Sequence, residues 1–315
     1  MNRYPPLDFS ALSTYSLFER DSKVTTGDFA KPLAAGMTVR QLLASLPNQL
    51  MGRDFPELIK RLALCHREQR PIIVGLGAHV IKVGLNPILI DLMERGLIAG
   101  LALNGAGLVH DTEIALAGRT SEDVDLVLGA GAFGAAKETG EFVNGAINRG
   151  YQAQQGLGEA VGEAILAENL PFASMSLLAS ARRLRVPLTV HVAVGTDIVH
   201  IHPTASGAAI GAGSHHDFKV FCAMVADLEG GAYLNLGSAV LLPEVFLKAL
   251  TVVRNLGHEV RHFTTANFDF IRQYRPLTNV VNRPTADGGK GYAITGHHEV
   301  MIPLLAAALL DELTN

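Results

Sequence analysis

Short apolar runs alternate with longer amphipathic stretches from about residue 71 to the end of the chain. Runs of four to eight apolar residues bounded by turn residues are typical of strands that are buried on both faces of a parallel sheet. The pattern predicts strands at Pro71–Gly75, Ile98–Leu103, Val186–Val194, Ala232–Leu236 and Glu259–Thr265.

Amphipathic stretches between and after these runs predict helices at Asn86–Arg95, Asp111–Ala117, Glu159–Asn169, Phe218–Leu228, Pro243–Leu256 and Met301–Leu313. Strands that alternate with helices indicate an α/β fold, here a doubly wound, Rossmann-like parallel sheet over residues 71–315. Residues 1–70 read as an N-terminal helical arm. Its first 35 residues are irregular and are expected to lie over the body, and two helices follow at Met37–Leu50 and Phe55–Glu68. We expect the two parts to form one compact unit.

Composition excludes several classes of partner. The 315-residue chain has a net charge of −4 and no basic block, so neither nucleic acid nor an anionic membrane is an expected partner. Its two cysteines do not make a disulfide framework. With no apolar run of membrane-spanning length and no signal-like start, a cytoplasmic location is expected. The hydrophobic fraction of 48% favours subunit interfaces.

The predicted strands share a type of ending. Glycine, hydroxyl or amide residues follow the apolar runs at Gly75/Gly77, Asn104–Gly107, Gly195/Thr196, Gly237/Ser238 and Thr264/Thr265. Backbone N–H groups at such turns can bind a pyrophosphate or a ribose. Five turns of this kind predict an extended crevice for a dinucleotide, although glycine is also common wherever a strand meets a helix.

The segment Val190–Pro203 (VHVAVGTDIVHIHP) concentrates polar chemistry after a buried strand. Asp197, His200 and His202 follow the Gly195 turn, at what would be the carboxyl end of a strand, where open α/β sheets bind ligands. An alternative is a metal site in which His200 and His202 act with His215 and His216, although no HExxH motif is present.

Two glycine-rich loops remain ambiguous by pattern alone. Lys290 lies in Asp287-Gly-Gly-Lys-Gly-Tyr, where it is either an ordinary solvated lysine or a neutral amine that forms a Schiff base. Gly129–Gly134 matches G-x-G-x-x-G, but a polar segment follows it and no acidic residue has the expected spacing, so we interpret it as a loop.

Several blocks, taken in order, resemble the deoxyhypusine synthase family. The similarity runs from about Pro71 to the C-terminus through PIIVGLGAHVIKVG, LALNGAGLVHDTEIAL, GTDIVHIHP, LNLGSAV, HFTTANFDF, RPTADGGKGY and EVMIPLLAAAL. The resemblance implies a homotetramer with active sites at subunit interfaces and with NAD across the carboxyl edge of the sheet. It also implies hydride transfer from an amine, capture of the resulting imine on a lysine and transfer to an acceptor.

Carried over by position, the resemblance makes Lys290 the covalent lysine and His202 the general base, with Asp197 in the same catalytic set. The implied NAD-binding residues are Ala78, His79, Asn104, Gly105, Ala106, Gly195, Thr265 and Ala266, and the implied substrate residues are His110, Asp111 and His297. This chain has Gly288 where the family has tryptophan, and His110 and His297 where it has carboxylates. Fewer carboxylates favour a smaller amine than spermidine.

The sequence therefore predicts an NAD-dependent, deoxyhypusine synthase-like transferase that acts on a small amine or polyamine through a lysine-imine intermediate. Two alternatives stay open. One is a metal-dependent lyase or hydrolase that uses the clustered histidines. The other is a non-catalytic protein of the same fold that binds NAD or a metabolite.

Overall fold

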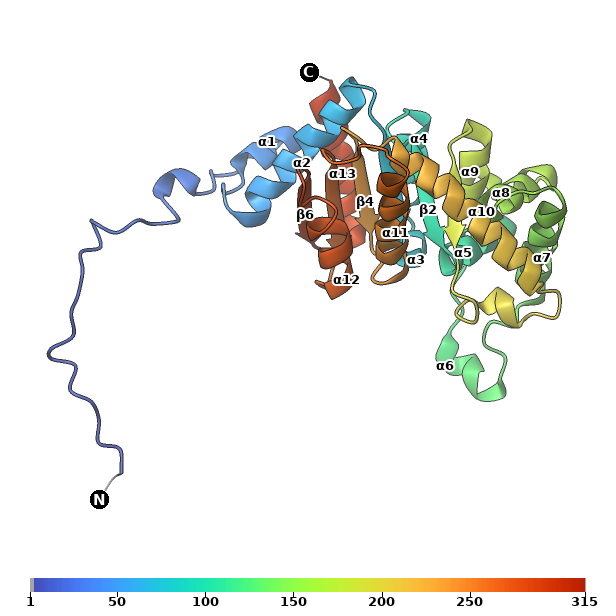
Figure 1. Ribbon diagram of the computed structural model, residues 1–315, viewed down its shortest axis with the longest axis horizontal. Helices are drawn as coiled ribbons and strands as arrows, with labels where there is room; N and C mark the ends of the chain where they lie inside the picture. Colours follow the sequence, from blue (N-terminus) through green and yellow to red (C-terminus); the bar gives the residue numbers. More distant parts are fainter. Residues whose placement is uncertain (1–2, 315) are drawn as a thin grey trace.

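The computed structural model describes residues 3–314 and contains one six-stranded sheet in which every neighbouring pair is parallel. The strands are β1 (Ile72–Leu76), β2 (Gly100–Asn104), β3 (Leu188–His191), β4 (Ala232–Leu236), β5 (Thr264–Asp269) and β6 (Lys290–Thr295). Helices cover both faces, which confirms the predicted α/β, doubly wound fold (Figure 1).

The strand order is β3-β2-β1-β4-β5-β6. The chain therefore builds outward from β1 to β3, crosses back to the middle, and builds outward again from β4 to β6. Connections leave β1 and β4 in opposite directions, so the carboxyl ends of these two strands form the switch point at which doubly wound sheets bind ligands. Leu76 pairs with Leu236 at this point.

One face of the sheet is covered mainly by α2, α4, α5, α8, α9 and α13, and the other by α10, α11 and η5 (Figure 1). The longer helices are α1 (Val39–Ser45), α2 (Leu50–Arg67), α4 (Asn86–Glu94), α5 (Gly105–Ala117), α7 (Lys137–Gln152), α8 (Leu157–Ala167), α9 (Leu177–Leu184), α10 (Gly207–Ala226), α11 (Leu241–Asn255) and α13 (His298–Leu313). The shorter ones are η1 (Thr26–Asp28), α3 (Ala78–Lys82), α6 (Val124–Val127), η2 (Leu128–Ala130), η3 (Ala173–Met175), η4 (Ile198–Ile201), α12 (Tyr274–Pro276) and the π-helical η5 (Leu277–Asn282). None of the helices within residues 3–314 is long and apolar enough to span a bilayer.

Close packing at the centre of the sheet explains one of the predicted turn glycines. Tyr233 of β4 is fully buried and stacks on Phe246 of α11 with 3.9 Å between ring centroids. A Cβ atom at Gly75 would lie 2.3 Å from the Tyr233 hydroxyl oxygen. Gly75 is therefore required for core packing rather than for a ligand.

The N-terminal segment departs from its prediction. Figure 1 shows the chain before α1 leading away from the sheet, and Phe18 and Leu7 are 96% and 81% exposed. The prediction that this segment lies over the body is wrong. The helices α1 and α2 do pack on the body, against α13.

Two strands near the C-terminus also differ from the pattern. β5 begins at Thr264, close to where the predicted strand ended, and β6 begins at Lys290, where a loop was expected. Thr264 pairs with Lys290 and with Ala232, the first residue of β4. These residues therefore lie at the amino edge of the sheet, opposite the switch point.

Candidate active site at the carboxyl edge of the sheet

A cavity of about 200 Å³ opens beside the carboxyl ends of β2 and β3. Its walls come from the end of α3, the first two turns of α5, the segment that leads into η4, and the protruding segment 119–136 that carries α6 (Figure 1). The polar side chains that line it are Lys82, His110, Glu113, Ser121, Glu122, Thr196 and Asp197. We call it the edge cavity.

Asp197 supplies the most unusual group of the edge cavity. The residue is 8% exposed, and its Oδ2 atom is buried without a hydrogen-bond partner among the described residues. Nε2 of His200 lies 3.9 Å from that oxygen. Burial raises the pKa of Asp197, and its interactions with His200 and Thr196 offset only part of the shift. An unpartnered buried carboxylate is costly, and such groups concentrate at functional sites.

The tautomer of His200 follows from its neighbours. Nδ1 accepts hydrogen bonds from the backbone N–H groups of Gly195, at 3.1 Å, and of Asp197, at 3.4 Å. The ring proton must therefore be on Nε2, which faces the Asp197 carboxylate. At 3.9 Å the two groups are not hydrogen-bonded, so among the described residues Asp197 Oδ2 keeps its accepting capacity.

The start of α5 leaves room for this carboxylate. Asn104 ends β2, and its side-chain oxygen accepts the N–H of Gly107 at 2.8 Å, which caps the helix. A Cβ atom at Gly105 would lie 2.0 Å from Asp197 Oδ2. Gly105 thus admits Asp197 to the positive end of a 13-residue helix, where a carboxylate is favoured.

A second polar chain lies on the α5 side of the edge cavity. His110 Nδ1 is 2.6 Å from Thr120 Oγ1, and Thr120 in turn donates to Glu113. Thr139 donates to the other oxygen of Glu113 at 3.2 Å. Burial alone would raise the pKa of Glu113, but these hydrogen bonds outweigh it and the pKa is lowered. Glu113 therefore stays ionised on one wall of the cavity, which Lys82 also lines.

Aromatic and imidazole rings gather at the switch point itself. The Phe270 ring, just after β5, is parallel to that of His297 with 6.0 Å between centroids. His79 lies 6.0 Å from Phe270 and 5.7 Å from His298. His298 is 1% exposed, its Nε2 faces the Phe268 carbonyl at 3.1 Å, and its Nδ1 is buried without a partner among residues 3–314.

The structure thus brings together most of the predicted cofactor residues and some of the predicted catalytic ones. Those that lie at the carboxyl edge are Ala78, His79, Asn104, Gly105, Ala106, His110, Gly195, Asp197 and His297. His202 follows η4, but its ring packs on α7 where Gly140 lacks a side chain, and its Nδ1 is 2.7 Å from Thr204 Oγ1. It lies outside the lining of the edge cavity.

Asp111, expected to bind substrate, is instead a structural carboxylate. It is fully buried, and burial raises its pKa. Its oxygens accept hydrogen bonds from Asn86, Ser176 and the backbone N–H groups of Leu177 and Leu178 at 2.5–3.0 Å. It therefore ties α5 to the start of α9, and both oxygens are already occupied.

Lys290, Thr265 and Ala266 are not brought to the carboxyl edge. Lys290 is the first residue of β6, and five residues at about 3.3 Å each put about 16 Å between it and Thr295, the last residue of that strand. Its Nζ lies over the Tyr292 ring, 5.7 Å from the centroid. Thr265 and Ala266 are buried at the start of β5. These three residues therefore do not share a site with the strand-end glycines.

The four histidines of the metal alternative are not assembled into one site. His215 and His216 are exposed on α10, whereas His200 and His202 lie at and after η4. Within residues 3–314, no group of three or more histidine, cysteine, aspartate or glutamate side chains is placed to hold a metal ion.

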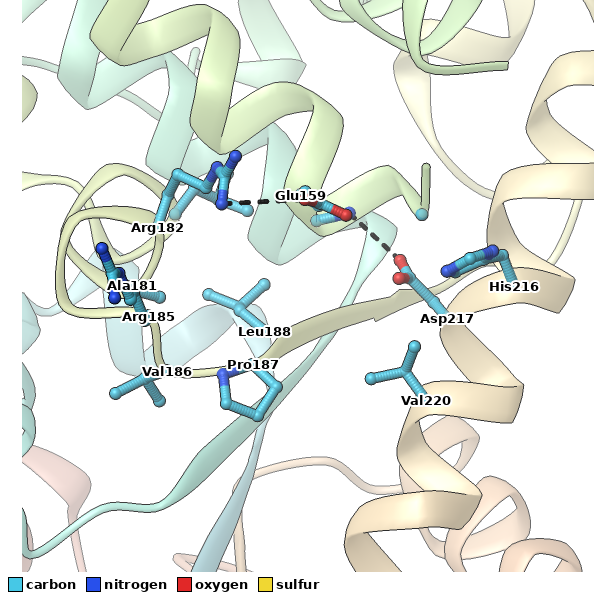
Figure 2. Close-up of a pocket in the computed structure, with 13 residues that line it drawn as sticks. Glu159, Ala181, Arg182, Arg185, Val186, Pro187, Leu188, His216, Asp217 and Val220 are labelled. Carbon is cyan, nitrogen blue, oxygen red and sulfur yellow. Dashed lines mark hydrogen bonds and ion pairs between the residues drawn. The ribbon is translucent and has the colours of Figure 1, made fainter. Parts of the chain in front are cut away.

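A second, larger cavity of about 380 Å³ lies beside the amino end of β3 (Figure 2). Three of its charged side chains, Glu159, Arg182 and Asp217, are engaged with protein. Arg182 pairs with Glu159 and Glu163 at 3.7 and 3.1 Å, and Asp217 accepts the N–H groups of Gly158 and Val190. Figure 2 shows Asp217 extending from α10 toward the start of α8. Asp217 thus caps α8 and covers the free edge of β3, a structural role.

Sequence reasoning missed three residues of this edge. His298 and Phe270 were given no place in the predicted NAD site, and Glu113 was seen only as part of a helix. Phe270 and His298 follow the ends of β5 and β6, so these two strands had to be placed correctly before the signal of these residues could be used.

Comparisons with known proteins identify the fold. No protein-family model matches the chain, and no curated protein matches it in sequence. A candidate LOR/SDH protein from Methanococcus maripaludis S2 is similar in structure, with TM-score 0.51 and 19% identity over 81% of this chain and 70% of that one. Unliganded AgrE has TM-score 0.55 and 18% identity over 84% of this chain, which spans about a third (34%) of AgrE.

The third comparison bears on the resemblance seen in the sequence. A candidate deoxyhypusine synthase from Entamoeba histolytica has TM-score 0.51 over 88% of this chain and 94% of that one, at 10% identity. The deoxyhypusine synthase-like fold is therefore confirmed. Identities this low establish the fold and leave the reaction to be argued from the site.

Proposed function

We propose that the protein is an NAD-dependent enzyme that oxidises a small amine at the carboxyl edge of the sheet. The observation that carries the proposal is the buried, unpartnered Oδ2 of Asp197 beside His200 in the edge cavity. A carboxylate of this kind is suited to hold a substrate ammonium group and to take a proton from it.

The residues at the switch point fit a dinucleotide. The strand order puts this point between β1 and β4. There, Nδ1 of His298 is a buried acceptor with no donor among residues 3–314, and the rings of Phe270 and His79 lie beside it. His79, Phe270 and His298 are the residues that would hold it. When bound, NAD⁺ accepts a hydride from the carbon atom that carries the substrate nitrogen.

The chain's own groups supply the proton chemistry. An amine that loses a hydride from carbon and a proton from nitrogen becomes an imine, and Asp197, which lines the edge cavity, would accept that proton. The burial that raises the pKa of Asp197 makes its carboxylate a better base. The His200 ring lies 3.9 Å from the carboxylate, and ionised Glu113 favours a cationic substrate in the same cavity.

Lysine-imine capture by Lys290 is not part of this proposal, because Lys290 lies at the amino edge of the sheet. The proposed reaction is the oxidation of the amine, and any transfer that follows it would need an acceptor other than this side chain. The small volume of the edge cavity, about 200 Å³, supports a small amine over a polyamine.

The test is a screen of small primary amines for reduction of NAD⁺, followed by the absorbance of the reduced nicotinamide. The Asp197→Asn variant is expected to lose about 100-fold or more of the rate, because a neutral amide neither holds an ammonium group nor takes its proton. Lys290→Ala should keep the wild-type rate. Activity with hydroxy compounds and with no amine would contradict the proposal, as would an Asp197→Asn variant at the wild-type rate.

A further inference from the structure

His298 is an acceptor that lacks a donor. Its Nε2 lies 3.1 Å from the Phe268 carbonyl oxygen, and since a carbonyl only accepts, this nitrogen must carry the ring proton. Nδ1 is then a lone-pair acceptor, and it is buried with no partner among the described residues. Buried polar atoms are nearly always paired, so this atom calls for a donor from outside the chain.

The ring of His298 lies at the switch point. A Cβ atom at Gly237, the residue after β4, would lie 2.7 Å from its Cε1. The Phe270 ring stands edge-on to it, with 6.2 Å between centroids and an interplanar angle of 85°. Phe270 is 46% exposed, so part of this side chain is open to solvent beside the buried imidazole.

We propose that Nδ1 of His298 accepts a hydrogen bond from a ribose hydroxyl of the dinucleotide, while Phe270 provides the face on which the attached heterocycle stacks. This inference rests on the proposed function and assigns residues within it. Because Nδ1 is an acceptor, it can bind a ribose hydroxyl, which donates a hydrogen bond. It cannot bind a phosphate oxygen in this way, because that oxygen only accepts. A planar ring stacked on Phe270 would leave its ribose at the edge of that ring, toward His298.

The experiment is a titration with NADH, followed by nicotinamide fluorescence; the chain contains no tryptophan to interfere. His298→Phe removes the acceptor and should weaken NADH binding about tenfold. His298→Gln keeps a side-chain acceptor and should stay within about threefold of wild type. His66→Phe, an exposed histidine near the end of α2 and remote from the switch point, is the matched control and should bind as wild type does.

Two further measurements complete the test. Phe270→Ala changes a half-exposed side chain, so it is informative even if His298→Phe does not fold, and it should also weaken NADH binding several-fold. ADP-ribose keeps both riboses and lacks nicotinamide, and its affinity can be measured by competition with NADH. In His298→Phe, the affinity for ADP-ribose should fall by the same factor as the affinity for NADH.

The outcomes distinguish a failure of the His298 assignment from a failure of the proposed function. If wild-type protein shows no saturable NADH binding, the proposed function fails and the inference fails with it. If wild-type protein binds NADH and His298→Phe or Phe270→Ala binds it equally well, the inference is overturned while the function stands. A loss in His298→Phe for NADH but not for ADP-ribose would make the carboxamide the donor and overturn the ribose assignment.

Discussion

Substituting alanine for Gly105 tests the geometry of the candidate site directly. The new Cβ atom would lie 2.0 Å from Asp197 Oδ2 and 2.4 Å from Cγ, whereas ordinary contacts begin near 3.4 Å. The carboxylate must therefore move by more than 1 Å or the start of α5 must shift. Overpacking of this kind costs about 1–3 kcal/mol, against a gain below about 1 kcal/mol from replacing glycine in a helix. We expect a net loss of stability of about 1–2 kcal/mol.

The assay is a double-mutant cycle measured by denaturant unfolding. In the Asp197→Ala background the obstructing carboxylate is gone, so Gly105→Ala should cost little, and the coupling energy should exceed about 1 kcal/mol. Gly145→Ala, a helix glycine of α7 whose nearest contact would be 3.6 Å away, is the matched control and should be neutral or slightly stabilising. Effects of Gly105→Ala and Asp197→Ala that add within about 0.5 kcal/mol would refute the placement of Asp197 against α5.

Three other predictions concern the titratable residues His191, Asp111 and Lys290. Burial lowers the pKa of His191 from 6.5 to about 4, so the unfolded chain binds more protons than the native one between these values. This residue should therefore remove up to about 3 kcal/mol of stability as the pH falls from 6.5 to 4, and in His191→Gln that part of the pH dependence should vanish in urea titrations. Asp111→Asn replaces a carboxylate that accepts two backbone N–H groups by an amide, so it should lower the free energy of unfolding by about 2–4 kcal/mol. An unchanged midpoint of denaturant unfolding would contradict the structural role of Asp111. Lys290→Ala loses one exposed cation–π contact and should leave both stability and NADH affinity within error of wild type; a large loss of affinity would restore Lys290 to the site.

The fold was predictable because most strands are uninterrupted apolar runs. β1, β2 and β4 were placed within two residues, and the alternation of strands with helices was sufficient for the parallel topology. β5 is different. Its sequence is TTANFD, yet all six residues are buried. Asn267 tolerates burial because its side-chain oxygen accepts a hydrogen bond from Asn235 of β4 at 2.7 Å. A polar strand paired inside the sheet has no apolar signature.

That one misplaced strand explains most of the errors at the site. With β5 predicted to end at Thr265, the residues Thr265 and Ala266 seemed to follow a strand, and Lys290 seemed to lie in a loop near them. The real β5 begins at Thr264, and the chain returns through η5 to begin β6 at Lys290. The segment around Asp197 was found because it follows the apolar β3. Its free carboxylate oxygen, by contrast, depends on the position of Gly105 in another element, which no local pattern encodes.

The most direct test of the central claim is a crystal structure of the protein grown with NAD⁺. The account predicts the dinucleotide at the carboxyl ends of β1 and β4, with a ribose at His298 and the nicotinamide end directed toward Asp197. A dinucleotide in the cavity beside Arg182 and Asp217 at the amino end of β3, or one that contacts Lys290, would contradict it.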